Sequence, residues 1–177
     1  AGAGAGRVSL YLQSKGHEVV AIDNSPLAIE VCRKRGVKDA RVMNITRVDS
    51  KMGKFDTITM FGNNFGLTAN FKRARWLLKR FYAVTADNAR IVAESNDPYF
   101  SKLPEHVRYH AYNLKRGRMG GQLRIRIRYR DYMTPWFDYL IVSKREMKQI
   151  LEGTGWRLER TYDHPRAGFY MAVIEKE

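Results

Sequence analysis

The sequence predicts an α/β protein with a doubly wound, mostly parallel sheet, an inserted antiparallel β segment and an antiparallel C-terminal hairpin. Three observations lead to this prediction. Short apolar runs alternate with amphipathic segments up to about residue 98, as in βαβ units. Between about residues 99 and 142 the pattern changes to two-residue alternation. One more helical segment and two alternating runs then close the chain at about 143–177.

The first elements are set by strong local signals. An amphipathic helix follows the opening glycines and ends at Gly16, and a short apolar strand then ends at Asp23. A second helix begins at once, with Ser25 as its N-cap and Pro26 in its first turn, and it ends at Gly36. These signals predict a helix, a strand and a second helix in the first 36 residues.

The rest of the core continues the alternation. The segments DARVMNI and FDTITMFGNNFG are predicted strands that lead into polar or glycine-bearing loops. A helix is predicted over 68–84, and ARIVAES is predicted as another buried strand. The helix should bury one face, made of Phe71, Ala74, Leu77, Leu78 and Phe81.

The inserted segment is predicted to be antiparallel. HVRYHAYN, GQLRIRIRYRDY and TPWFDYLIVS alternate with a period of two, and the turn-rich LKRGRMGG separates the first two. A helix follows with a capping box formed by Ser143 and Glu146. WRLERTY and AGFYMAVIEKE then predict the terminal hairpin.

Length and composition indicate one globular domain. The chain has 177 residues, of which 44% are hydrophobic. No apolar run approaches the roughly 20 residues of a membrane helix, and no signal-peptide pattern opens the chain. Cys32 is the only cysteine and should be a small buried residue on a helix. We therefore expect a cytoplasmic protein with no membrane partner, no disulfide and no metal site.

The charge is strongly basic. Thirty-two Lys and Arg against 18 Asp and Glu give a net charge of +14, which attracts nucleic acids, anionic membranes or acidic small molecules. Four arginines, at 124, 126, 128 and 130, occupy alternate positions and would share one face of a strand. That face could bind phosphates or an acidic substrate, or it could be a solvated face that discourages aggregation. Its apolar opposite face would allow a homodimer, but the sequence assigns no oligomeric state.

The opening AGAGAG has the composition of a ligand-binding loop. A glycine-rich turn before a helix brings backbone N–H groups close to a ligand. Gly2, Gly4 and Gly6 alternate strictly, which disfavours the dinucleotide fingerprint of a nicotinamide dehydrogenase because that needs glycines at positions one, three and six. Asp23, at the end of the following strand, could accept both hydroxyls of an adenosine ribose.

The stretch GAGAGRVSLYLQSKGHEVVAIDNSPLAIEVC resembles the nucleotide-binding core of class I S-adenosylmethionine-dependent methyltransferases, and the resemblance extends to about residue 95. It implies a Rossmann-like fold, a single methyltransferase-like domain over 1–177 and S-adenosyl-L-methionine as cofactor. The family's first strand, and the acidic residue before the glycines, have no counterpart in this chain. We therefore expect the working protein to have a further N-terminal segment.

The resemblance also implies roles for individual residues. The three glycines would surround the methionine portion of the cofactor, and Asp23 would bind its ribose. Asn44 stands where the family usually has an aspartate that accepts from the adenine amino group. The implied cofactor-binding residues are Gly2, Gly4, Gly6, Asp23, Asn24, Asn44, Ile45, Gly62 and Asn63.

Methyl transfer from a sulfonium depends mainly on the positioning of the acceptor, so no general base is assigned. The segment 99–142 should cover the acceptor. A small-molecule acceptor is favoured, and the alternative is an RNA methyltransferase or RNA-binding protein that uses the arginine face. The substrate-side candidates are Asn64, His106, His110, Tyr112, Arg124, Arg126 and Arg128, although each histidine could equally be an ordinary surface or packed side chain.

Overall fold

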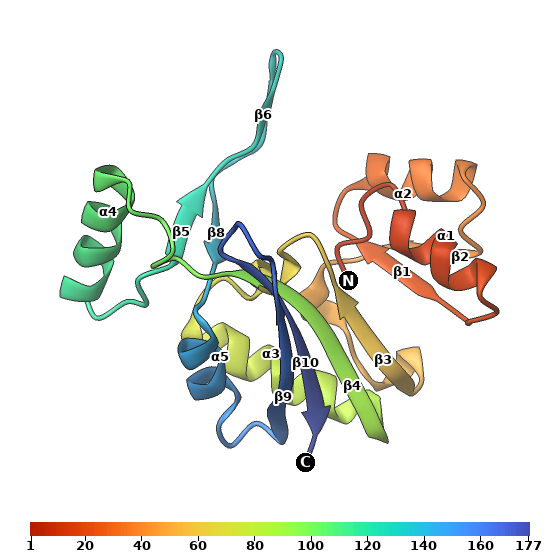
Figure 1. Ribbon diagram of the computed structural model, residues 1–177. Helices are drawn as coiled ribbons and strands as arrows, with labels where there is room; N and C mark the ends of the chain where they lie inside the picture. Colours follow the sequence, from red (N-terminus) through yellow and green to blue (C-terminus); the bar gives the residue numbers. More distant parts are fainter. The chain divides into compact units, whose positions relative to one another are not determined.

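The computed structural model describes residues 1–177, which divide into two compact units, Ala1–Met52 and Gly53–Glu177 (Figure 1). The first unit contains one parallel strand pair flanked by short helices, with Val20 of β1 opposite Asp39 of β2. Its elements are α1 (Arg7–Ser14), β1 (Val20–Asp23), α2 (Pro26–Lys34), β2 (Asp39–Val42) and the 3-10 turns η1 (Ile45–Arg47) and η2 (Ser50–Met52).

Local signals explain the helix boundaries in this unit. The Ser25 hydroxyl accepts a hydrogen bond from the Ala28 N–H (3.3 Å), and Pro26 occupies the first turn of α2, as predicted. Gly16 and Gly36 follow the two helices with φ of +86° and +92°, a conformation that favours glycine. Cys32 is fully buried in the small core of the unit, which confirms its predicted place.

The second unit is built on a four-stranded sheet in the order β3-β4-β10-β9. β3 and β4 are parallel, whereas β10 runs antiparallel to both β4 and β9. The elements that form or directly accompany this sheet are β3 (Phe55–Met60), η3 (Asn64–Thr68), α3 (Phe71–Ala83), β4 (Thr85–Asn96), α5 (Lys144–Leu151), β9 (Trp156–Asp163) and β10 (Phe169–Lys176). The α/β class and the terminal hairpin are thus confirmed.

Helices α3 and α5 complete the core of the second unit. Four of the five residues predicted for the buried face of α3 are buried, but Phe71 is exposed. Phe71 is the first residue of the helix, after the N-cap Asn70, and its ring lies beside the Arg75 guanidinium instead of in the core. The predicted capping box of α5 is present, because Ser143 and Glu146 exchange their side-chain and backbone hydrogen bonds.

The inserted segment differs most from the prediction. Its elements are α4 (Pro104–Lys115), β5 (Gln122–Ile125), β6 (Arg128–Tyr129), β7 (Tyr132–Met133) and β8 (Phe137–Leu140). HVRYHAYN is therefore a helix and not a strand: proline starts α4, and the buried His110 and Asn113 lie three residues apart on one helical face. The Asn113 amide donates to the Gly120 and Gln122 carbonyls, which fastens the helix to the start of β5.

The four arginines do not form one continuous ladder. The strand stops after Ile125, resumes for two residues in β6, and turns at Arg130, whose φ is +51°. The four side chains therefore do not share one face of a strand. The predicted antiparallel pairing itself is present, between β5 and β8 and between β6 and β7.

None of the helices combines the length and the apolar character needed to cross a bilayer.

Candidate cofactor and acceptor sites

The AGAGAG segment forms a tight loop beside the end of β1. The N–H groups of Gly2 and Ala3 both donate to the Ile22 carbonyl, each at 3.0 Å. Gly2, Gly4 and Gly6 have φ of +69°, +53° and +79°, so the alternation of glycines matches an alternation of left-handed backbone. Side chains are disfavoured at these φ values, which explains why glycine occupies every second position.

Asp23 holds this loop through both carboxylate oxygens. Oδ2 accepts from the Gly4 N–H and Oδ1 from the Ser25 N–H, both at 2.9 Å. A carboxylate offers about four acceptor positions, so each oxygen retains the capacity to accept from another donor. Asp23 therefore couples the glycine loop to the start of α2 and can still bind hydroxyl groups.

Gly6 is packed too closely for any side chain. A Cβ built there would lie 2.8 Å from Val37 Cγ2 and 3.1 Å from Cys32 Sγ. The Cys32 thiol in turn donates to the Gly4 carbonyl at 3.1 Å. Burial, and then the nearby Asp23, raise the pKa of this thiol, so Cys32 stays protonated and acts as a structural donor.

The predicted adenine contacts lie at the start of α2 and after β2. Asn24 and Asn44 are exposed, and Ile45 is buried. The Asn44 Oδ1 accepts from both the N–H (3.0 Å) and the hydroxyl (2.8 Å) of Thr46, so it caps the short turn η1. Binding an adenine amino group through this oxygen would compete with those two bonds.

The loop after β3 brings together residues from distant parts of the second unit. Gly62 and Asn63 both have left-handed φ, and the Gly62 N–H donates to Glu94 Oε2 at 3.2 Å. The Tyr139 hydroxyl, from β8, donates to the Asn63 carbonyl. The ring of Tyr139 lies so close to Gly66 that a Cβ there would fall 2.2 Å from a ring carbon.

Tyr139 and Glu94 were not predicted as site residues. Nothing in the local pattern marks them, because Tyr139 and Asn63 are 76 positions apart. Burial, and then the Glu94 charge, raise the pKa of Tyr139 to about 12, so its hydroxyl remains a donor at neutral pH. Asn64, another predicted residue, begins η3.

The side-chain carboxamide oxygen of Asn63 lacks a hydrogen-bond donor. Its Oδ1 is buried and has no hydrogen-bond partner in the structure. A buried acceptor without a donor is costly, and such atoms are rare in native proteins. A ligand N–H or O–H at this position would satisfy it.

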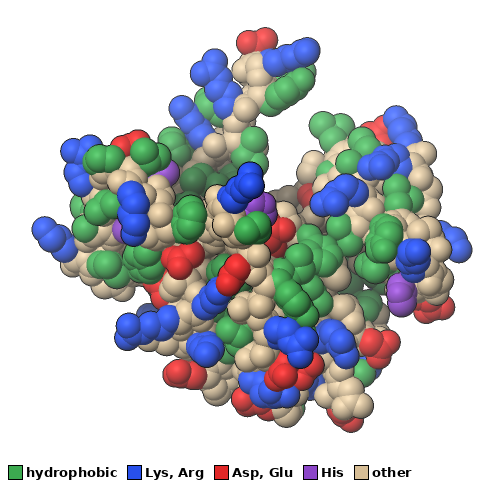
Figure 2. All heavy atoms as spheres, viewed as in Figure 1, with side chains coloured by type: hydrophobic (Ala, Val, Ile, Leu, Met, Phe, Trp, Pro, Cys, Tyr) green, Lys and Arg blue, Asp and Glu red, His purple; other side chains and the backbone are tan.

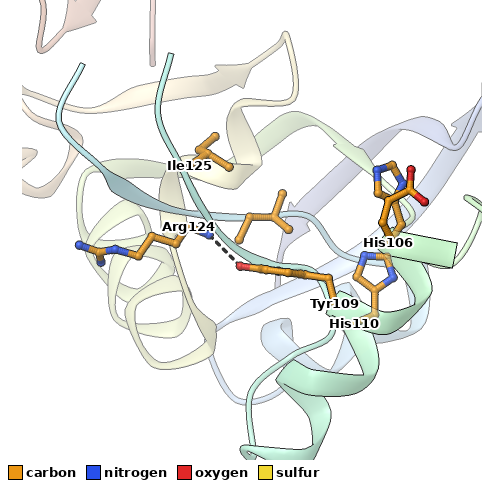
Figure 3. Close-up of a pocket in the computed structure, with 7 residues that line it drawn as sticks. His106, Tyr109, His110, Arg124 and Ile125 are labelled. Atoms are coloured by element: carbon orange, nitrogen blue, oxygen red, sulfur yellow. Dashed lines mark hydrogen bonds between the residues drawn. The ribbon is translucent and has the colours of Figure 1, made fainter. Parts of the chain in front are cut away.

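A cavity of about 320 Å³ lies between α4 and β5 (Figure 3). Three of the seven substrate-side candidates, His106, His110 and Arg124, line it, whereas Tyr112, Arg126 and Arg128 do not. The Tyr109 hydroxyl accepts from the Arg124 N–H at 3.3 Å, so α4 is tied to β5. The full lining is Glu105, His106, Tyr109, His110, Leu123, Arg124 and Ile125.

Some of the polar groups that line this cavity already have a partner within the protein. The guanidinium of Arg124 extends away from the two histidines in Figure 3 and pairs with Asp138 of β8 at 3.1 Å. His106 Nδ1 lies 2.7 Å from the Ser101 hydroxyl. Burial, and then the neighbouring His106, lower the pKa of His110, which keeps its imidazole neutral near pH 7.

The lowered pKa of His110 predicts a pH-dependent stability. The unfolded chain binds this proton more readily than the folded chain does, so stability should be lost as pH falls below 6.5, the ordinary value for histidine. His110→Gln should reduce that loss, and the exposed His17→Gln should leave it unchanged. Urea unfolding between about pH 7.5 and pH 5 measures the free energy of unfolding of each variant. An equal dependence of this free energy on pH in the two variants would contradict the prediction.

Comparison with known proteins finds one family and many related folds. The family described as "Methyltransferase domain" matches residues 1–88. A search of curated protein sequences finds no significant match. Among solved structures, a SAM-dependent methyltransferase from Bacteroides fragilis, crystallised with S-adenosyl-L-homocysteine, has a TM-score of 0.80 and 28% identity, with 99% of this chain and 70% of that chain covered.

Two further structures share the fold at 17% identity. A SAM-dependent methyltransferase from Methanosarcina mazei has a TM-score of 0.73, with 99% of this chain and 89% of that chain covered. The second is the 1,6-didemethyltoxoflavin-N1-methyltransferase of Burkholderia thailandensis, solved with bound 1,6-didemethyltoxoflavin and S-adenosylhomocysteine. It has a TM-score of 0.62, with 99% of this chain and 68% of that chain covered.

Proposed function

We propose that this chain, which belongs to the class I S-adenosylmethionine-dependent methyltransferase family, transfers the methyl group of its cofactor to a small molecule held in the α4–β5 cavity. The size of the cavity is the observation that supports a small molecule as the acceptor. Its volume of about 320 Å³ lies within the range of small-molecule sites, about 300–1,000 Å³. Apolar walls from Leu123 and Ile125 with a few polar groups are also typical of such sites. The Burkholderia protein, which has the same fold, was solved with both a small molecule, 1,6-didemethyltoxoflavin, and S-adenosylhomocysteine bound.

The cofactor of the family is S-adenosyl-L-methionine, and the glycine loop has features that fit it. Its left-handed glycines leave backbone free of side chains, and Asp23 retains acceptor capacity for ribose hydroxyls. For the adenine end, Asn24, Asn44 and Ile45 are our candidates. When bound, the cofactor supplies a methyl group already activated on a cationic sulfur.

The loop after β3 is our candidate for positioning the reacting groups. Gly62 and Asn63 follow a parallel strand, where ligands of open α/β sheets usually bind. The unpaired Asn63 Oδ1 would accept from a donor on the bound ligand. Tyr139 acts as a positioning residue, because its hydroxyl holds the Asn63 carbonyl and its ring packs on Gly66.

Tyr139→Phe should slow methyl transfer while leaving the fold intact. The phenylalanine ring can still pack on Gly66, but the hydrogen bond to the Asn63 carbonyl is lost. One such bond contributes about 0.5–1.5 kcal/mol, so we expect kcat to fall about 2- to 10-fold with little change in KM. The matched control is the exposed Tyr162→Phe on β9. A wild-type kcat for Tyr139→Phe would show that the Tyr139 hydroxyl does not position the loop after β3 for methyl transfer.

The acceptor class is tested by transfer of a labelled methyl group. The chain is incubated with methyl-labelled S-adenosylmethionine and separate fractions of metabolites, RNA and protein. We expect label in the metabolite fraction, and we expect Leu123→Trp to reduce its transfer by filling the cavity. Label confined to RNA or protein would overturn the small-molecule proposal without affecting the family assignment.

A further inference from the structure

The hairpin formed by residues 126–136, which we call the arm, projects from the second unit (Figure 1). Its ladder consists of two residue pairs, Arg128 with Met133 and Tyr129 with Tyr132. Below them, the Thr134 N–H donates to the Ile127 carbonyl and the Ile127 N–H to the Thr134 hydroxyl, both at 2.9 Å. A two-stranded hairpin this short is marginally stable in water by itself. A binding partner would add the contacts that the arm lacks.

The arm exposes large apolar side chains. Each of five residues has between 52% and 80% of its surface exposed, and Tyr132 is the most exposed. Large contiguous apolar patches on a protein surface usually mark an interaction site. The five residues are Ile127, Tyr129, Tyr132, Met133 and Trp136.

The arm is also basic. Arg126, Arg128 and Arg130 lie within five residues, and Asp131 is the only acidic residue between 126 and 136. None of the three arginines forms an ion pair, unlike Arg124, which is paired with Asp138. Figure 2 shows basic and hydrophobic side chains together along this projection. The arm therefore offers unneutralised positive charge beside aromatic surface.

Aromatic rings hold two of these guanidinium groups in place. The Arg126 guanidinium lies 4.8 Å from the centre of the Trp136 ring, and that of Arg130 lies 5.3 Å from the centre of the Tyr129 ring. A stacked guanidinium keeps its N–H edge available for phosphate oxygens. Tyr132 is 80% exposed, so its ring offers a surface on which a base can stack.

We infer that the arm binds single-stranded nucleic acid. Arginines that contact the phosphate backbone, together with aromatic rings on which bases stack, are the two elements of sequence-independent single-strand binding. Charge complementarity favours this partner over a second copy of the chain, because every copy carries a net charge of +14. The inference rests on the arm alone and does not depend on the identity of the methyl acceptor.

The test is fluorescence anisotropy of the full chain with labelled oligouridylate and oligothymidylate of about 12 nucleotides. The variant R126Q/R128Q/R130Q removes three charges from the arm, and K72Q/K79Q/K148Q removes three exposed charges from α3 and α5 as the matched control. With three phosphate contacts at about 0.7 each, the arm variant should lower the slope of log K against log salt by about 2. The lysine variant should bind at least 10-fold more tightly than the arm variant.

Stacking is tested separately at Tyr132. Tyr132→Ala should weaken binding at least 5-fold with the salt slope unchanged, and Tyr132→Phe should restore it because the ring is kept. Equal losses of oligonucleotide affinity in the arginine and lysine variants would overturn the inference, as would wild-type affinity in Tyr132→Ala. Three other results would also overturn it: no binding of either oligonucleotide, a dimer in sedimentation that Tyr132→Ala dissociates, or binding only to vesicles of anionic phospholipid.

Discussion

Gly6→Ala should lower the free energy of unfolding by about 2–5 kcal/mol. Two costs combine at this position. The left-handed φ of +79° disfavours any Cβ, and the Cβ would press against Val37 and Cys32 of the small core. The measurement is urea unfolding of the full chain, followed by circular dichroism.

Gly16→Ala is the matched control for this prediction. Gly16 also has a left-handed φ, +86°, but a Cβ there would meet open space. Gly16→Ala should therefore lower the free energy of unfolding only by the conformational cost of about 1–2 kcal/mol. If the two variants were equally stable, the close packing of the glycine loop against α2 would not contribute to stability.

Asp23→Asn should weaken S-adenosylmethionine binding about 100-fold. The asparagine keeps one acceptor oxygen but turns the other into an NH₂ group, which would face the N–H of either Gly4 or Ser25. The bond that we propose to the ribose loses its charge, a change of about 1.5–3 kcal/mol, or about 10- to 150-fold in affinity. The loop also loses one charge-assisted bond, which lowers its stability. Calorimetry with S-adenosylmethionine and S-adenosylhomocysteine measures the effect.

Asp39→Asn is the control for the cofactor experiment. Asp39 lies in the same unit, where it pairs with Arg41 at 2.6 Å on the surface. Its substitution should leave the affinity for the cofactor within about 2-fold of wild type, since exposed ion pairs contribute little. A folded Asp23→Asn variant with unchanged affinity would show that Asp23 does not bind the cofactor.

The elements of the α/β core were predictable because their signals are local. Ser25 and Pro26 start α2, and Gly36 ends it, through interactions within a few residues of the chain. The capping box of α5 and the alternation in β9 and β10 are equally local. Phe71 was the exception on α3, because a residue at the first turn of a helix can leave the buried face.

The inserted segment was predicted less well, for a physical reason. In HVRYHAYN, apolar and polar residues fit both a strand and a helix, and Pro104, two residues before this run, begins the helix. The arginine alternation correctly indicated extended chain at β5 and β6, but the left-handed Arg130 and the two-residue ladder ended it early. Alternation by itself does not determine how long a strand stays paired.

The sequence by itself determined the glycine loop, the helix that follows it and Asp23, because glycine spacing and capping act within a short stretch of chain. Only the tertiary structure decided that Tyr139 holds the loop after β3, that Glu94 accepts from Gly62, and that His106 and His110 share a cavity with Arg124. These contacts join residues from 14 to 76 positions apart through side-chain packing, and no short sequence pattern records which distant side chains will meet.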